Sequence, residues 1–138
     1  MICSNIVLPI SVLPHHATSG NESISREVGI GIRNYFDRAL GTILLYRYER
    51  VQYEEYVDAH PDATMSSVYG AEHLLRLFVK LPALLQATKL DGKELKILCD
   101  KVQDILKYLD SRITGTQQLF VKQYMPTDKA YADKYAQI

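Results

Sequence analysis

Residues 68–82 read VYGAEHLLRLFVKLP, and this stretch decides the fold. At about 100° per residue, its apolar side chains would cover an arc of roughly 220° around a helix. A helix with so wide an apolar surface is expected at the centre of a helical domain. The remaining stripe is polar and requires hydrogen-bond partners or water. That stripe consists of Tyr69, Glu72, His73, Arg76 and Lys80.

Three residues of the polar stripe carry specific expectations. Glu72 precedes Arg76 by four residues, which is the favourable order for an ion pair along one helix, so the spacing predicts that these two pair. His73 belongs to no Cys/His spacing that binds zinc, and we expect it to be a structural histidine with a hydrogen-bond partner.

The ends of the central helix have short sequence signals. Ser66 or Ser67 is expected to cap its N-terminus, since a serine hydroxyl can accept from the first free backbone N–H groups. Pro82 is expected to kink the helix or to restart it over residues 83–87, because proline lacks the N–H that a helix interior needs.

Two helices are predicted ahead of the central one. The first begins at Ser23 or Ser25 and weakens at Gly41, where we expect a kink or break. The second covers residues 51–59 and ends before Pro61, because a residue that precedes proline disfavours the helical conformation. The expected apolar face of the first consists of Val28, Ile32, Tyr35, Phe36, Ala39, Ile43 and Tyr46.

A last helix is predicted after Asp91, whose spacing to Glu94 is that of a capping box. Its apolar side chains occupy an arc of roughly 120° and are expected to face the core. They are Leu95, Leu98, Cys99, Val102, Ile105, Leu106 and Leu109. We expect a core in which the two strongest helices pack on each other through Leu75, Phe78, Leu98, Val102 and Leu106.

These patterns together predict an all-α fold, with a single compact helical domain over residues 23–138 after an irregular segment over residues 1–22.

Sixteen basic residues balance sixteen acidic ones, which argues against direct binding of nucleic acid. The apolar run over residues 6–13 is too short to span a membrane. Cys3 and Cys99 are expected to be free thiols, with Cys99 on a buried face.

Known catalytic and cofactor signatures are absent from the sequence. It contains neither the HExxH pattern of zinc proteases nor the GxSxG pattern of serine hydrolases, and no glycine-rich phosphate loop follows a strand. We therefore predict that the protein is not an enzyme and that it uses no metal or cofactor. Ten tyrosines without a tryptophan favour a binding module, because tyrosine is common in protein interfaces.

Several blocks resemble the MRG (mortality-factor-related) domain, and they occur in the order of that family. The resemblance covers roughly residues 25–109 and is far more specific than one short motif. The blocks include Tyr35-Phe36, Leu44-Leu45-Tyr46, Tyr48-Glu49-Arg50, His60-Pro61-Asp62-Ala63, Tyr69-Gly70-Ala71 with residues 73–79, and residues 106–109.

The resemblance implies a non-enzymatic nuclear adaptor. Members of the family are subunits of NuA4-type histone acetyltransferase complexes and of Sin3-type histone deacetylase complexes, and the domain binds partner segments with a Phe-x-Leu-Pro core in a shallow apolar groove. Tyr46, Val79 and Lys80 correspond by position to residues of that groove. Lys80 stands where relatives often carry arginine.

The sequence also departs from the family pattern. The chromodomain that many relatives carry is not expected ahead of Ser25, and the tryptophan-containing opening segment of the MRG domain is missing. We therefore interpret the chain as a truncated or divergent member, which leaves an alternative open. The chain could be a degenerate helical domain that serves only oligomerisation and binds no peptide.

Overall fold

The computed structural model describes residues 22–112, 126 and 128–135, and all regular structure within these residues is helical. The predicted all-α fold is thus confirmed. Residues 1–21 of the predicted irregular segment, including Cys3, lie outside the described residues, whereas its last residue, Glu22, begins α1. The elements are α1 (Glu22–Ala39), a π-helical turn η2 (Leu40–Leu44), α2 (Arg47–Ala59), a 3-10 turn η3 (Met65–Ser67), α3 (Ala71–Gln86), α4 (Gly92–Ser111) and α5 (Lys129–Tyr135).

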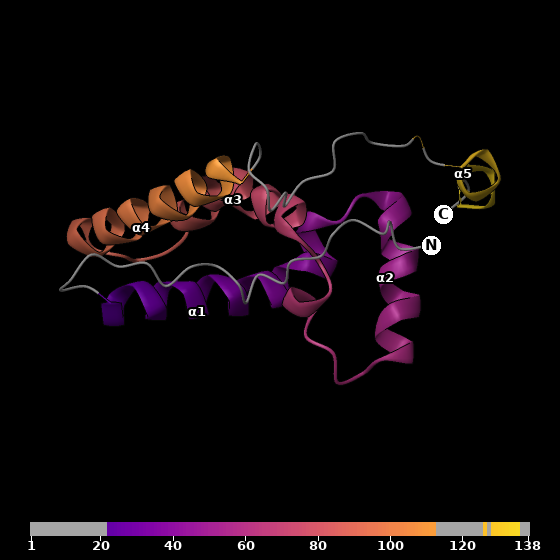
Figure 1. Ribbon diagram of the computed structural model, residues 1–138, viewed down its shortest axis with the longest axis horizontal. Coiled ribbons are helices and arrows are strands. Elements are labelled where there is room, and N and C mark those ends of the chain that lie inside the picture. Colours follow the sequence, from indigo (N-terminus) through magenta and orange to yellow (C-terminus); the bar gives the residue numbers. More distant parts are fainter. Residues whose placement is uncertain (1–21, 113–125, 127, 136–138) are drawn as a thin grey trace.

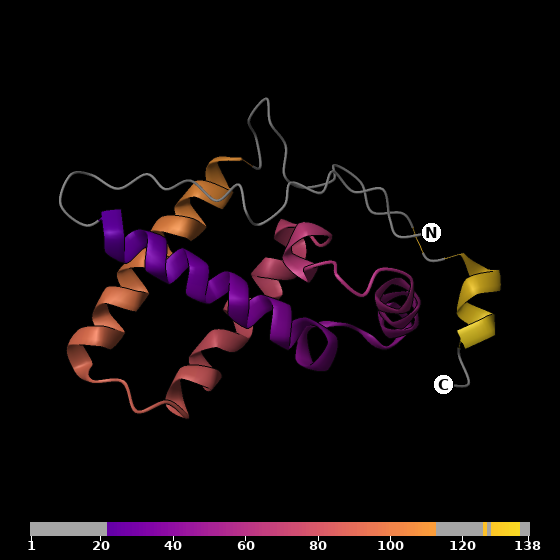
Figure 2. The same cartoon turned by 90° about the horizontal axis from the view of Figure 1, so that it is seen from below.

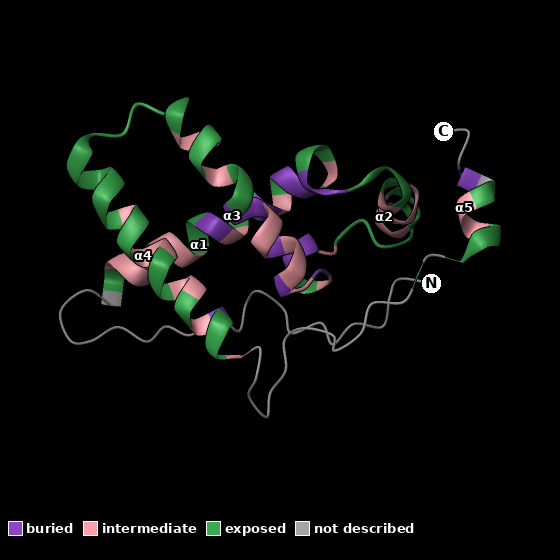
Figure 3. Ribbon diagram, turned by 90° about the horizontal axis from the view of Figure 1, so that it is seen from above, coloured by how far each residue is buried: buried purple, intermediate pink, exposed green. Residues whose placement is uncertain are grey.

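Helix α1 lies across a hairpin formed by α3 and α4, and α2 stands to one side of them (Figures 1 and 2). The core forms where α1, η2 and α3 meet, and Figure 3 shows the buried residues concentrated there. Its largest fully buried side chains are Phe36, Leu40, Leu74 and Leu77. None of the described helices combines the length and the apolar composition needed to cross a bilayer.

The break expected near Gly41 is present as the turn η2, and it changes which residues face inward. A π-helical turn spaces hydrogen-bonded residues by five positions, so the apolar face shifts relative to an uninterrupted α-helix. Leu40 and Leu44 are buried as a result. Ile43 and Tyr46, which the sequence pattern placed on the apolar face, are instead 42% and 66% exposed.

Helix α3 begins later than predicted, and it runs through Pro82 without restarting there. Neither serine caps it, because Gly70 occupies the N-cap and Ser66 is buried in η3. There, Ser66 donates its backbone N–H and its hydroxyl to the Asp37 carboxylate, which ties η3 to α1. Pro82 does not end the helix, which continues to Gln86. Leu81 and Leu84 pack against the core on either side of Pro82 and hold this last part in place.

Helix α4 has the predicted start but is less buried than predicted. Asp91 accepts from the backbone N–H groups of Lys93 and Glu94, both at 2.8 Å, and thus forms the capping box. The first half of the helix is mostly exposed, as Figure 3 shows, whereas Leu109 in the last turn is buried. The apolar arc is therefore only partly used, and the free thiol of Cys99 is exposed rather than buried.

The predicted burial of the core residues of α3 and α4 is confirmed in part. Phe78 is buried, and Leu75, Val102 and Leu106 are partly buried against the core. Leu98 is only half-buried and is not part of the core cluster, because it lies too early in α4. The short helix α5 was not predicted. It contacts α2 through Tyr131, whose hydroxyl donates to the Tyr48 carbonyl oxygen at 2.8 Å.

Candidate functional site

The three residues predicted to bind a partner are all exposed. Tyr46 precedes α2 as its N-cap residue, in an extended conformation, and its ring does not lie on a helix face as the sequence pattern suggested. Tyr46 is 66% exposed and Val79 of α3 is 78% exposed. Lys80 is exposed next to Val79. We refer to Tyr46, Val79 and Lys80 as the candidate surface.

Arg76 connects the parts of the candidate surface. Its guanidinium carbon lies 4.1 Å from the centre of the Tyr46 ring, which is a cation–π contact. Val79 and Lys80 follow Arg76 by three and four residues, so they occupy the same side of α3 one turn further on. The structure thus brings Tyr46 to the side of α3 that carries Val79 and Lys80, opposite the buried Leu74 and Phe78.

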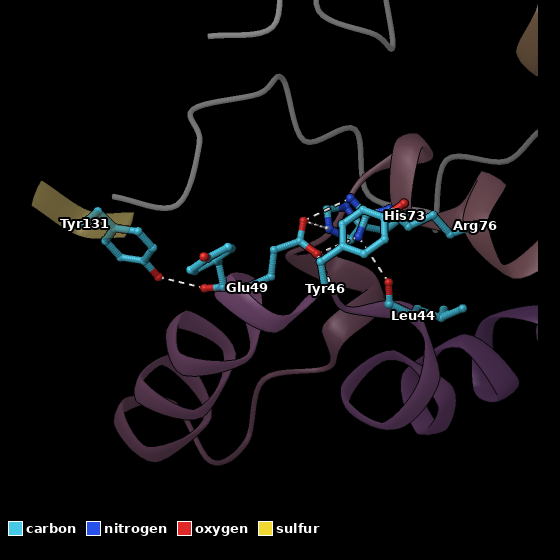
Figure 4. Close-up of polar contacts among 7 residues, drawn as sticks. Leu44, Tyr46, Glu49, His73, Arg76 and Tyr131 are labelled. Atoms are coloured by element: carbon cyan, nitrogen blue, oxygen red, sulfur yellow. Dashed lines mark hydrogen bonds and ion pairs between the residues drawn. The ribbon is translucent and has the colours of Figure 1, made fainter. Parts of the chain in front are cut away.

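A carboxylate from α2 holds Arg76 in place, as Figure 4 shows. Nη1 of Arg76 donates to Oε2 of Glu49 at 2.6 Å, and Nη2 donates to Oε1 at 2.9 Å. This two-pronged geometry fits the planar fork of arginine to the two carboxylate oxygens. Nη1 also donates to the Leu44 carbonyl oxygen at 3.1 Å. Arg76 therefore joins η2, α2 and α3.

The Glu49 carboxylate has two further donors. The backbone N–H of Tyr46 donates to Oε2 at 2.7 Å, which fixes the start of α2. Nε2 of His73 lies 3.3 Å from Oε1. An ionised carboxylate only accepts hydrogen bonds, so Nε2 of His73 is the donor in this contact. The His73 ring in turn meets the buried Tyr69 ring edge to face at 4.8 Å.

These contacts change the acidity of the residues involved. Burial alone would raise the pKa of Glu49, but hydrogen bonds from His73, Arg76 and Tyr46 outweigh it and lower the pKa from 4.5 to about 2. Burial lowers the pKa of Arg76, yet the Glu49 carboxylate reverses that effect and raises it above its ordinary value. Burial, aided by the negative charge of Glu49, raises the pKa of Tyr69 to about 12.

The polar stripe of α3 thus finds its partner in another helix. The expectation that Glu72 is the main partner of Arg76 is wrong, because the carboxylate that binds its guanidinium is that of Glu49. The charge of Glu72 contributes to the raised pKa of Arg76. The expectation of a hydrogen-bonded structural His73 is confirmed. Sequence reasoning missed Glu49, although its place three residues after Tyr46 is the position from which an acid can accept from an N-cap N–H.

This region combines exposed apolar side chains with charged ones. Within the part of the chain that the structure describes, no three His, Cys, Asp or Glu side chains gather to hold a metal ion. The cluster instead offers an exposed aromatic ring, an exposed aliphatic side chain and a cation, supported from below by a fixed ion pair. Such a combination can bind an extended segment of another protein.

Comparison with known proteins shows which family the sequence resembles. The family model described as MRG matches residues 11–126. The NuA4 complex subunit EAF3 homolog of Dictyostelium discoideum is 45% identical over 106 residues, which is 77% of this chain and 27% of that protein. Human mortality factor 4-like protein 1 is 53% identical over 92 residues, 67% of this chain and 25% of that protein.

Human mortality factor 4-like protein 2 is 58% identical over 83 residues, which is 60% of this chain and 29% of that protein. The matched part of the chain thus spans between 25% and 29% of the length of these three relatives. The family model covers most of the chain and includes the candidate surface together with Glu49 and Arg76. This chain therefore belongs to the MRG family.

Proposed function

We propose that this chain is a non-catalytic, nuclear adaptor domain that binds short apolar segments of partner proteins through the candidate surface. Its setting would be a NuA4-type histone acetyltransferase complex or a Sin3-type histone deacetylase complex, in which it would serve chromatin remodelling and transcription regulation. Family membership supports this setting, as does the name of the relative that is a NuA4 complex subunit.

The observation that carries the binding proposal is the exposure of Tyr46 and Val79. At 66% and 78%, they have the two largest exposed fractions among the large apolar residues that the structure describes. Large apolar side chains that gather on one side of a protein commonly mark an interaction site. Here Tyr46 lies against Arg76, and Val79 follows Arg76 by one turn of α3.

Each residue of the candidate surface has a distinct role in this proposal. Tyr46 supplies ring area, with its hydroxyl at the rim, and Val79 supplies the apolar floor. Lys80 takes part in none of the ion pairs among the described residues, so its ammonium group is available to carbonyl oxygens or carboxylates of the partner. The preferred partner is thus an apolar segment such as Phe-x-Leu-Pro with an acidic residue nearby.

A peptide titration tests the proposal. A fluorescently labelled Phe-x-Leu-Pro peptide is titrated with the wild-type protein, with Tyr46→Ala and with a control, Tyr35→Ala, which removes a tyrosine that is 40% exposed on α1. We expect Tyr46→Ala to weaken binding by at least about tenfold, since a central aromatic anchor carries much of the affinity of an interface. The control is expected to bind like the wild type. Equal affinities of all three folded proteins would remove Tyr46 from the site.

The alternative function, oligomerisation without peptide binding, has one observation in its favour. Leu95 and Ile97 on the first half of α4 are 39% and 42% exposed and could pack against a second copy. This alternative predicts a self-associated species in sedimentation velocity and no peptide binding by the wild type. A monomer that binds the peptide would support the adaptor proposal and exclude the alternative.

A further inference from the structure

We propose that Arg76 and Glu49 are positioning residues that hold Tyr46 in the orientation in which a partner segment meets it. This inference rests on the proposed function of the same surface. It adds two residues that the sequence did not assign to binding, and neither of them needs to contact the partner.

The backbone and the ring of Tyr46 are held separately. Its backbone N–H donates to Oε2 of Glu49 at 2.7 Å, and its ring lies against the Arg76 guanidinium at 4.1 Å. Glu49 also binds that guanidinium through both carboxylate oxygens. One ion pair therefore restrains both ends of a residue that is otherwise 66% exposed.

The ion pair is itself fixed from several directions. Arg76 also donates to the Leu44 carbonyl oxygen, two residues before Tyr46, and His73 shares Oε1 of Glu49. The pair is only partly exposed, with 25% of the Arg76 side chain and 29% of the Glu49 side chain accessible. Water and salt therefore screen it less than a fully exposed pair.

A restrained Tyr46 lowers the cost of binding. A partner that meets a free tyrosine must order its side chain, whereas a ring already held in place has lost that freedom before the encounter. Replacing Arg76 by lysine keeps the positive charge but removes the planar fork that binds Glu49 and stacks on the ring. We expect Arg76→Lys to weaken peptide binding about three- to tenfold, which matches the cost of ordering one side chain.

A double-mutant cycle separates positioning from a merely structural role. Affinity for the Phe-x-Leu-Pro peptide is measured for the wild type, Arg76→Lys, Tyr46→Ala and the double variant, with Arg26→Lys on the exposed part of α1 as a matched control. If Arg76 acts through Tyr46, the effect of Arg76→Lys disappears in the Tyr46→Ala background. A full effect of Arg76→Lys in both backgrounds would overturn the inference.

A measurement without peptide keeps the inference testable on its own. Ring carbon relaxation of Tyr46 by NMR is expected to show an ordered ring in the wild type and a more mobile one in Arg76→Lys and in Glu49→Gln. An equally ordered ring in every folded variant would overturn the positioning role. If the wild type binds no peptide while the ring loses order in the variants, the proposed function fails and the positioning of Tyr46 stands. Glu49→Gln serves as the second variant if Arg76→Lys does not fold.

Discussion

The Glu49 carboxylate of α2 binds the Arg76 guanidinium of α3 through both of its oxygens, across 27 residues of sequence. The same guanidinium lies against the Tyr46 ring, at the start of α2. This pair joins the N-terminus of α2 to the middle of α3, although α2 has no fully buried residue of its own. A polar contact, rather than apolar packing alone, therefore sets how α2 sits on the core.

Glu49→Gln should destabilise the fold. The amide cannot offer two anionic oxygens, so the partly buried Arg76 charge loses its partner, at an expected cost of about 1–3 kcal/mol. Urea unfolding measures the loss. Glu54→Gln, an exposed change on the same helix, is the matched control and should change the free energy of unfolding by less than about 0.5 kcal/mol. Equal effects of the two variants would contradict the importance of the pair.

Acid should weaken the same contact in a defined range. Because the pKa of Glu49 is about 2 in the folded protein and 4.5 without these contacts, its contribution is complete above pH 4.5 and is lost as the pH falls toward 2. We expect this contribution to the free energy of unfolding to be about 2 kcal/mol. It is smaller than the pKa difference alone would give, because water screens a carboxylate side chain that is 29% exposed. Urea midpoints at pH 7, 4 and 3 measure it. The wild type and Glu49→Gln should converge as the pH falls, and parallel curves would show that Glu49 is not the group involved.

Phe78→Ala and Leu98→Ala should differ strongly in their effects. Phe78 is 9% exposed in the core, so its truncation should cost about 3–5 kcal/mol. Leu98 is half-buried outside the core cluster, so its truncation should lower the free energy of unfolding by about 1 kcal/mol or less. Chemical denaturation compares the two variants. A loss below about 1 kcal/mol for Phe78→Ala would contradict a role of Phe78 in the core.

Gly41→Ala should destabilise the turn η2. A Cβ at this position would lie 2.7 Å from ring atoms of Tyr53, which packs against the core from α2. The ring would have to move, at an expected cost of about 1–3 kcal/mol. Gly29→Ala on α1 is the control, because its Cβ meets nothing within 4 Å, and it should stabilise by up to about 1 kcal/mol. Tyr53→Ala should remove most of the penalty at Gly41, and an unchanged penalty would contradict the steric cause.

The sequence predicted the elements better than their contacts. Helix propensities and capping patterns act locally, so the break near Gly41 and the cap at Asp91 were both predictable. The shift of the buried face after η2 was not predictable, because the extra residue in a π-helical turn leaves no signal in the spacing of apolar residues. The exposure of Cys99 was unpredictable for a related reason. An apolar helix face is buried only where another element covers it, and the spacing of residues does not show which part is covered.

The candidate site was predictable only as far as the family resemblance reached. Tyr46, Val79 and Lys80 came from matching positions, and the structure finds all three exposed. Glu49 could not be identified as the partner of Arg76 from the sequence. Glu72, four residues before Arg76 on the same helix, satisfies the rule for local ion pairs, whereas no such rule points to an acid in another helix. The acid that binds Arg76 is determined by how α2 packs on α3. The local spacing of residues does not contain that information.

Mapping a bound peptide onto the protein tests the central claim most directly. In a ¹⁵N-labelled sample titrated with the Phe-x-Leu-Pro peptide, we expect the largest amide shifts at Tyr46, Val79 and Lys80, with smaller ones at Arg76. Shifts that cluster instead on the exposed first half of α4, or the absence of any shift at saturating peptide, would contradict the assignment of the binding surface.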